Sequence, residues 1–261
     1  MPEHFQQLKN WLNSVRLSTH HFALCLMSVC FLCSQDAKAD EQFSIAVGLA
    51  KPPYVIQEND TGFELDLIRN ITKKMGKSTK FVYTQFGHSP KMLDVNGIDA
   101  VMTTNKLVFG DESKLSNEYI TYQNVAISLK QKNLQINEIK DLAMYSIASF
   151  QKADKVLGET FANAVKASPL YLKVADQSQQ PSLLLKERID VLIMDKNIFI
   201  YLVKKLNIDN IDETFTFHPV FPTTQYRMAF KNEENLKTFN TILSEYLQTE
   251  EYQLLRKRYN L

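Results

Sequence analysis

The sequence of 261 residues predicts an α/β protein of two lobes, each with a mostly parallel sheet flanked by helices. Two observations predict this class. Short apolar runs alternate with amphipathic helical segments over residues 43–206, a pattern typical of parallel strands covered by helices. In addition, an Ile-Asp pair followed by an apolar run occurs twice, as IDAVMTT at 98–104 and IDVLIMD at 189–195. The alternation therefore forms two successive series, one for each lobe.

The first series has the order strand, helix, strand, helix, strand. Its clearest element is the helix at 63–76, where apolar residues recur at helical intervals, acidic residues occupy the first turn, and Gly76 follows the last turn. We expect strands at 43–50, 80–86 and 98–104, helices at 63–76 and near 89–95, and a loop at 51–62.

The second series repeats this order further along the chain. We expect strands at 145–150, 170–175 and 189–195, and helices at 151–167, 181–188 and 196–206. Pro181 is well placed in the first turn of its helix.

The N-terminal residues have the layout of a secretory signal peptide. Phe22–Leu32 is an apolar run in which only Ser28 is polar, and the small-x-small site Ala37-Lys38-Ala39 follows it. The alternative is a membrane anchor, but the run is shorter than the roughly 20 residues that span a bilayer. We expect cleavage after Ala39 and release into the periplasm, so that residues 1–39 are absent from the mature protein.

Composition excludes several classes of function for residues 40–261. All three cysteines precede Asp40, so no disulfide or thiolate metal site is available. The 27 basic and 27 acidic residues of this range form no basic stripe, which argues against binding to nucleic acid or anionic membranes. Its two histidines, His88 and His218, lack metal-ligand spacing, and no nucleophile motif or phosphate loop is present. We expect a monomer without catalysis, catalytic residues, cofactor or metal.

The two repeated phrases end in polar residues, Thr104 and Asp195. In open α/β sheets, ligands bind beyond the carboxyl ends of the strands. If the lobes face each other, both side chains point into one cleft and are candidate ligand-binding residues. The alternative is that Thr104 and Asp195 cap the segments that follow them.

The order and spacing of several motifs resemble a known family. These motifs are KPPYVIQENDTGFELDLIRNITKKMG, GIDAVM, LSNEY, RIDVLIMD and YRMAFKNEENLKTFNTILSEY. The chain resembles family 3 of the bacterial periplasmic solute-binding proteins, the polar amino-acid binders of ABC importers, over nearly all of 43–261. The resemblance implies the type 2 periplasmic-binding fold, which closes on a small-molecule ligand.

The resemblance also implies a division of the chain. Lobe 1 would comprise 40–128 and 223–261, lobe 2 would comprise 129–222, and the crossing strands would lie near 126–130 and 222–228. The partner would be an ABC permease. The alternatives are a periplasmic sensor subunit that presents ligand to a membrane protein, and a dehydratase-like enzyme on the same fold.

Several residue roles follow from the resemblance alone. The family pattern implies ligand-binding positions at Tyr54, Glu64, Tyr119, Phe150, Gln151 and Asp195. Among these, Tyr54 would pack on the ligand, the turn at Phe150 and Gln151 would offer backbone amides, and Asp195 would receive an ammonium group.

One expected residue is missing. Amino-acid binders of this family grip the α-carboxylate with an Arg seven residues before the serine that corresponds to Ser116, and that position is Phe109. Counting forward from Asp99 gives Asp111 instead, and no Arg lies between Arg69 and Arg188. We therefore expect a small, polar, amine-bearing ligand to which a carboxylate adds little, such as an amine, a peptide fragment or a signal molecule. Arg227 and Lys106 are the alternative cations.

Overall fold

The computed structural model describes residues 41–84 and 89–261, and Glu41–Leu261 forms one compact unit. This unit contains two five-stranded sheets. The expected signal peptide and His88 lie outside the described residues. Over the described ranges, no helix combines the length and the apolar character that crossing a membrane requires.

The first sheet has the strand order β2-β1-β3-β10-β4. Its strands are β1 (Glu41–Gly48), β2 (Lys77–Thr84), β3 (Ala100–Thr104), β4 (Ile120–Tyr122) and β10 (Thr224–Phe230). The first three are parallel to one another, whereas β10 runs antiparallel to β3 and β4.

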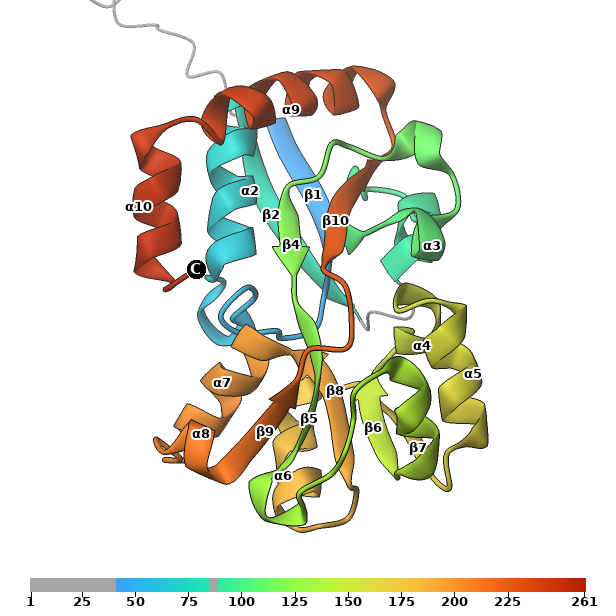
Figure 1. Ribbon diagram of the computed structural model, residues 1–261. Helices are drawn as coiled ribbons and strands as arrows, with labels where there is room; N and C mark the ends of the chain where they lie inside the picture. Colours follow the sequence, from blue (N-terminus) through green and yellow to red (C-terminus); the bar gives the residue numbers. More distant parts are fainter. Residues whose placement is uncertain (1–40, 85–88) are drawn as a thin grey trace, which may run out of the picture. The chain divides into compact units, whose positions relative to one another are not determined.

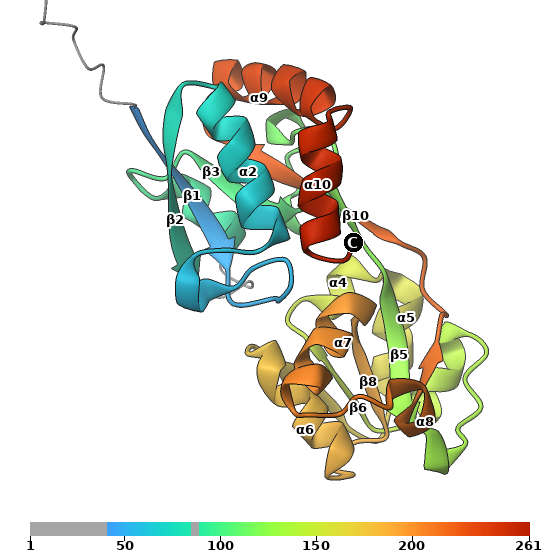
Figure 2. The same cartoon turned by 90° about the vertical axis from the view of Figure 1, so that its left-hand side faces the viewer.

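Both faces of this sheet are covered. The helical segments are η1 (Gln57–Asn59), α2 (Phe63–Lys74), η2 (Ser89–Asp94), α3 (Lys106–Phe109), η3 (Glu112–Lys114), α9 (Glu233–Tyr246) and α10 (Glu250–Arg258). Figure 2 shows α2 beside α10, with α9 across their ends. Side chains alternate along β1, so Ile45 and Val47 belong to the main core while Ala46 packs with Leu93 and Ile98 on the other face.

The second sheet has the order β7-β6-β8-β5-β9 and repeats the arrangement of the first. Its strands are β5 (Asn124–Leu129), β6 (Ile147–Phe150), β7 (Tyr171–Val174), β8 (Val191–Asp195) and β9 (Phe215–His218). Strands β6, β7 and β8 are parallel, and β5 is antiparallel to β8 and β9. The two-lobed α/β class is confirmed. Each sheet is also mostly parallel as expected, because four of its five strands run the same way and one strand, β10 beside β3 or β5 beside β8, runs opposite.

The second sheet carries its own helices. They are η4 (Lys130–Lys132), η5 (Ile139–Met144), α4 (Ala153–Val156), α5 (Glu159–Ala167), η6 (Gln177–Gln179), α6 (Gln180–Leu185), α7 (Lys196–Lys205) and α8 (Ile211–Thr214). The single helix expected at 151–167 is two helices. Gly158 has a φ of 86°, which is not a helical backbone angle but is one that glycine adopts readily. Helix α5 starts directly after Gly158.

The repeated Ile-Asp phrase makes the same contact in both sheets. Asp99 accepts a hydrogen bond from Ser44 N at 2.8 Å, and Asp190 accepts one from Ser146 N at 3.0 Å. The backbone N–H of each aspartate donates back to the same serine's carbonyl. The aspartate of each phrase therefore holds the start of its strand, β3 or β8, against the neighbouring strand, β1 or β6.

The chain passes between the sheets twice, at Gln123 between β4 and β5 and at 219–223 between β9 and β10 (Figure 1). The expected limit of lobe 1 at residue 128 falls inside β5. That strand pairs in the second sheet from its first residue, where Asn124 lies opposite Asp195.

Candidate functional site

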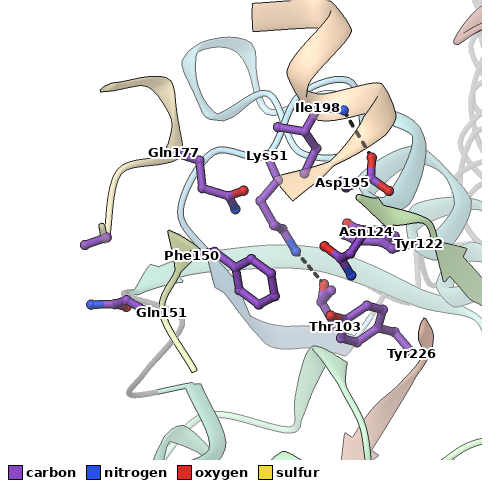
Figure 3. Close-up of a pocket in the computed structure, with 11 residues that line it drawn as sticks. Lys51, Thr103, Tyr122, Asn124, Phe150, Gln151, Gln177, Asp195, Ile198 and Tyr226 are labelled. Atoms are coloured by element: carbon purple, nitrogen blue, oxygen red, sulfur yellow. Dashed lines mark hydrogen bonds between the residues drawn. The ribbon is translucent and has the colours of Figure 1, made fainter. Parts of the chain in front are cut away.

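Residues from both sheets enclose a small cavity of about 30 Å³ (Figure 3). It is lined by Lys51, Thr103, Tyr122, Asn124, Phe150, Gln151, Ala175, Gln177, Asp195, Ile198 and Tyr226. One water needs roughly 10–15 Å³ of such space, so the cavity has room for water but not for an amino acid. A solute can enter only if its walls move apart.

Lys51 supplies the positive charge of the cavity. Its carbonyl accepts hydrogen bonds from Tyr54 N and Val55 N, which folds the loop after β1 back on itself. Its Nζ donates to Thr103 Oγ1 at 2.9 Å and lies 3.7 Å from Glu64 Oε1. Burial lowers the pKa of Lys51, and the nearby charges of Glu64 and Asp195 oppose that shift.

Glu64 is fully buried in the first turn of α2, behind the cavity wall. Its Oε2 accepts hydrogen bonds from Thr103 Oγ1 and from the Tyr119 hydroxyl, both at 2.6 Å. Its Oε1 accepts one from the Tyr122 hydroxyl. Three hydroxyl groups therefore stabilise this carboxylate before any ligand arrives. Glu64 and Tyr119 do not line the cavity.

Thr103, and not Thr104, faces the cavity. Thr103 has a φ of 56°, a left-handed conformation that is strained for a β-branched residue. Its N–H donates to the Tyr119 hydroxyl at 2.9 Å. Thr104 is fully buried, and its Oγ1 has no hydrogen-bond partner among the described residues. The left-handed backbone at Thr103 interrupts the regular alternation of side chains along β3, so the two threonines have different surroundings.

Asp195 both caps a helix and lines the cavity. Its Oδ1 accepts hydrogen bonds from Asn197 N at 2.9 Å and Ile198 N at 3.1 Å, at the start of α7. Its Oδ2 accepts one from Gln123 N at 2.8 Å. Burial raises the pKa of Asp195 to about 6, while these N–H groups act in the opposite direction. Asp195 therefore has the capping role considered from the sequence and also lines the cavity, where its binding of a ligand stays a prediction.

Tyr54 connects the loop after β1 with the second sheet. Its ring stacks on Tyr122 with centroids 4.2 Å apart. Its hydroxyl donates to Asp195 Oδ1 at 3.3 Å and accepts from Asn197 Nδ2 at 3.1 Å. Tyr54 thus supports the wall but is not a lining residue. Among the expected site residues, Phe150, Gln151 and Asp195 line the cavity (Figure 3).

The alternative cations considered from the sequence lie elsewhere. Arg227 pairs with Glu118 Oε1 at 3.0 Å, and both residues line a separate open groove together with Lys106. Sequence analysis did not single out Lys51, although its place three residues before Tyr54 in the same loop was an available signal.

Neither a metal site nor a histidine distinguishes this cavity. No group of three or more His, Cys, Asp or Glu within residues 41–84 and 89–261 could hold a metal ion. His218 Nε2 lies 3.0 Å from Ser128 Oγ and is not among the lining residues.

The profile of the bacterial extracellular solute-binding proteins, family 3, matches residues 43–261. The chain belongs to this family. It is a solute-binding protein, and the earlier resemblance is confirmed. No curated protein matches the chain.

Solved structures of three kinds share the fold. A substrate-binding protein of an ABC uptake transporter from Streptococcus pneumoniae, with bound histidine, is 16% identical with a TM-score of 0.68, covering 84% of this chain and 92% of that chain. A histidine kinase sensor domain is 14% identical with a TM-score of 0.70, covering 85% and 97%. An ancestral amino acid-binding protein, a precursor of cyclohexadienyl dehydratase, is 16% identical with a TM-score of 0.67, covering 84% and 95%. At these identities the likeness shows the fold of this family member.

Proposed function

We propose that this solute-binding protein captures a small, polar, amine-bearing ligand in the cavity and delivers it to an ABC permease. One observation carries the proposal: Asp195 is a buried carboxylate at the carboxyl end of β8 that faces the cavity. Among the described residues, its Oδ1 accepts three hydrogen bonds, whereas Oδ2 accepts only that of Gln123 N. A carboxylate oxygen can accept more than one hydrogen bond, so Oδ2 can receive an ammonium group.

A thermal-shift screen of residues 40–261 tests this proposal. A ligand that binds only the folded state raises stability, by about 2.7 kcal/mol at one hundred times its Kd. Amino acids and polyamines should raise the melting temperature, and sugars without an amine should not. A screen in which only compounds lacking an amine stabilise the protein would contradict the proposed ligand class.

Two other roles fit the same fold. A sensor subunit would use the same cavity, and a histidine kinase sensor domain has this architecture. Permease and ATPase genes beside this gene would favour import, and a lone sensor gene would favour signalling. A dehydratase-like enzyme is the third role, motivated by the likeness to a dehydratase precursor. Proton NMR of a bound solute should show it unchanged after prolonged incubation, whereas loss of water from it would indicate catalysis.

We also propose that the protein is exported, cut after Ala39 and released as a monomer. The motivation is the apolar run before Ala37-Lys38-Ala39. Mass spectrometry of the periplasmic fraction should find Asp40 at the N-terminus, and light scattering should give the mass of one chain. Recovery of an intact Phe22–Leu32 segment in the membrane fraction would contradict processing.

A further inference from the structure

Lys51 has the position of a ligand-binding group, although the sequence suggested only Arg227 and Lys106 as alternative cations for the ligand. Of the residues that line the cavity within the described ranges, Lys51 is the only cation and Asp195 the only anion. The two side chains come from different sheets. Lys51 lies in the loop that follows β1 of the first sheet, and Asp195 is the last residue of β8 in the second sheet. The cavity therefore presents a positive and a negative group on its walls (Figure 3).

We infer that Lys51 binds an acidic group of the ligand, so that the cavity selects a zwitterion such as an amino acid over the corresponding amine. The inference rests on the proposed function, because it assigns a binding residue to a second group, the carboxylate, of the same amine-bearing ligand. The ammonium group would lie at Asp195 and the carboxylate at Lys51.

The ammonium group of Lys51 has donors to spare. It carries three N–H groups, and one donates to Thr103 Oγ1. Glu64 Oε1 lies 3.7 Å away, which is an ion-pair separation and not a hydrogen-bond length. A ligand oxygen that enters the cavity can accept from a remaining N–H.

Glu64 holds Lys51 in place without depending on it. Its oxygens already accept hydrogen bonds from Thr103, Tyr119 and Tyr122, so hydroxyl groups stabilise the carboxylate charge. A lysine is therefore not required as a donor to satisfy Glu64. Burial lowers the pKa of Lys51, and the buried negative charge of Glu64 opposes that shift by favouring the charged form, which is the form that binds an anion.

The other candidate cations occupy different surroundings. Arg227 is paired with Glu118, and Lys106 lines the same separate groove. Neither reaches the cavity lining, so a carboxylate in the cavity meets Lys51 first.

Calorimetry on the whole mature chain tests the inference with matched probes. Each common amino acid is compared with its decarboxylated amine, for example histidine with histamine and arginine with agmatine. Wild-type protein should bind at least one amino acid about tenfold or more tightly than its amine, since one charge-assisted contact is lost. Lys51→Met should reduce that preference to within about threefold.

Two further variants keep the result interpretable. The single variant Lys51→Met leaves the buried charge of Glu64 without its partner and could fail to fold for that reason. The double variant Lys51→Met with Glu64→Gln has no charge at either position and replaces it in that case. Arg227→Met removes the alternative cation and should keep the wild-type preference.

The outcomes separate the two proposals. If wild-type protein binds amines as tightly as amino acids, or if Arg227→Met abolishes the preference, the assignment of Lys51 is overturned and the amine-binding function stands. If neither amino acids nor amines bind, the proposed function fails and the inference with it.

Discussion

Lys51 Nζ lies 3.7 Å from Glu64 Oε1, and both side chains are buried beside the cavity. Breaking such a pair from one side leaves an uncompensated buried charge, which costs far more than losing an exposed ion pair. This relationship gives the first prediction.

Glu64→Gln should lower the free energy of unfolding by about 3–5 kcal/mol, the usual cost of breaking a buried pair. The double variant with Lys51→Met should recover part of this loss, giving a coupling energy of about 1 kcal/mol or more in a double-mutant cycle. Urea denaturation measures both quantities.

Glu118→Gln is the matched control, because Glu118 and Arg227 form a pair whose side chains are each 36% exposed. Its cost should stay below about 1 kcal/mol. A Glu64→Gln variant that loses no more stability than Glu118→Gln would refute the importance of the buried pair.

Asp195 should make stability depend on pH. Its pKa is raised from 3.8 to about 6 by burial, so the folded state binds the proton more tightly than the unfolded state. The resulting stabilisation is present below about pH 4 and is lost as pH rises through about 6, a change of roughly 3 kcal/mol at 1.36 kcal/mol per pKa unit. Denaturation of wild type and Asp195→Asn across this range isolates the contribution. An unchanged difference between the two proteins would contradict it.

Affinity for an amine should change with pH in the opposite direction. An ammonium group pairs with the ionised carboxylate, so binding weakens up to about tenfold per pH unit below about pH 6. Asp195→Asn should lose about 2–5 kcal/mol of binding free energy at neutral pH, the cost of losing one partner of a buried charge pair. Calorimetry in buffers of different ionisation enthalpy should detect proton release on binding near pH 5. Tight, pH-independent binding by the variant would rule out the role of Asp195.

Tyr54→Phe should make closure less favourable while keeping the ring stack on Tyr122. The substitution removes the hydroxyl that hydrogen-bonds to Asp195 and Asn197. Together these two hydrogen bonds, one charge-assisted and one neutral, contribute about 1–2 kcal/mol. Small-angle scattering should show a smaller radius of gyration when solute is bound, and a larger ligand-free radius for Tyr54→Phe than for wild type.

Tyr83→Phe controls for the loss of a tyrosine hydroxyl, because Tyr83 donates to Asp60 at the surface. It should scatter like wild type. Identical curves for all proteins, with and without saturating solute, would contradict closure about the two connecting segments.

Gly62→Ala should displace the Tyr54 loop. Gly62 has a φ of 124°, and a Cβ there would lie 2.4 Å from Tyr54 O, which accepts the Glu64 N–H. The substitution adds a backbone clash to the strain of the φ angle, so it should cost more than about 1 kcal/mol and weaken ligand binding.

Gly76→Ala is the control at the other end of α2. Gly76 also has a positive φ, of 73°, but an added Cβ meets nothing within 4 Å. It should cost about 1 kcal/mol and leave binding unchanged. Equal stability losses for the two variants would show that the contact with Tyr54 is unimportant.

Local patterns in the sequence were sufficient for the strands of the two predicted series, for helix α2 and for part of the site. Helix α2 occupies Phe63–Lys74, close to the predicted 63–76, because its apolar spacing and terminal charges act within a few residues. The repeated Ile-Asp phrase predicted β3 and β8, and Asp195 lies at the end of β8 beside the cavity.

Only the tertiary structure decided which side chains form the cavity. Lys51 donates a hydrogen bond to Thr103, which lies 52 residues away in the sequence. Glu64 accepts hydrogen bonds from Tyr119 and Tyr122, which lie 55 and 58 residues away. Strand β5 belongs to the second sheet because β8 and β9 pair with it. The choice of Thr103 over Thr104 follows the left-handed backbone at Thr103. Periodicity reports contacts within one element, whereas a cavity between two sheets is set by contacts between residues that are distant in sequence.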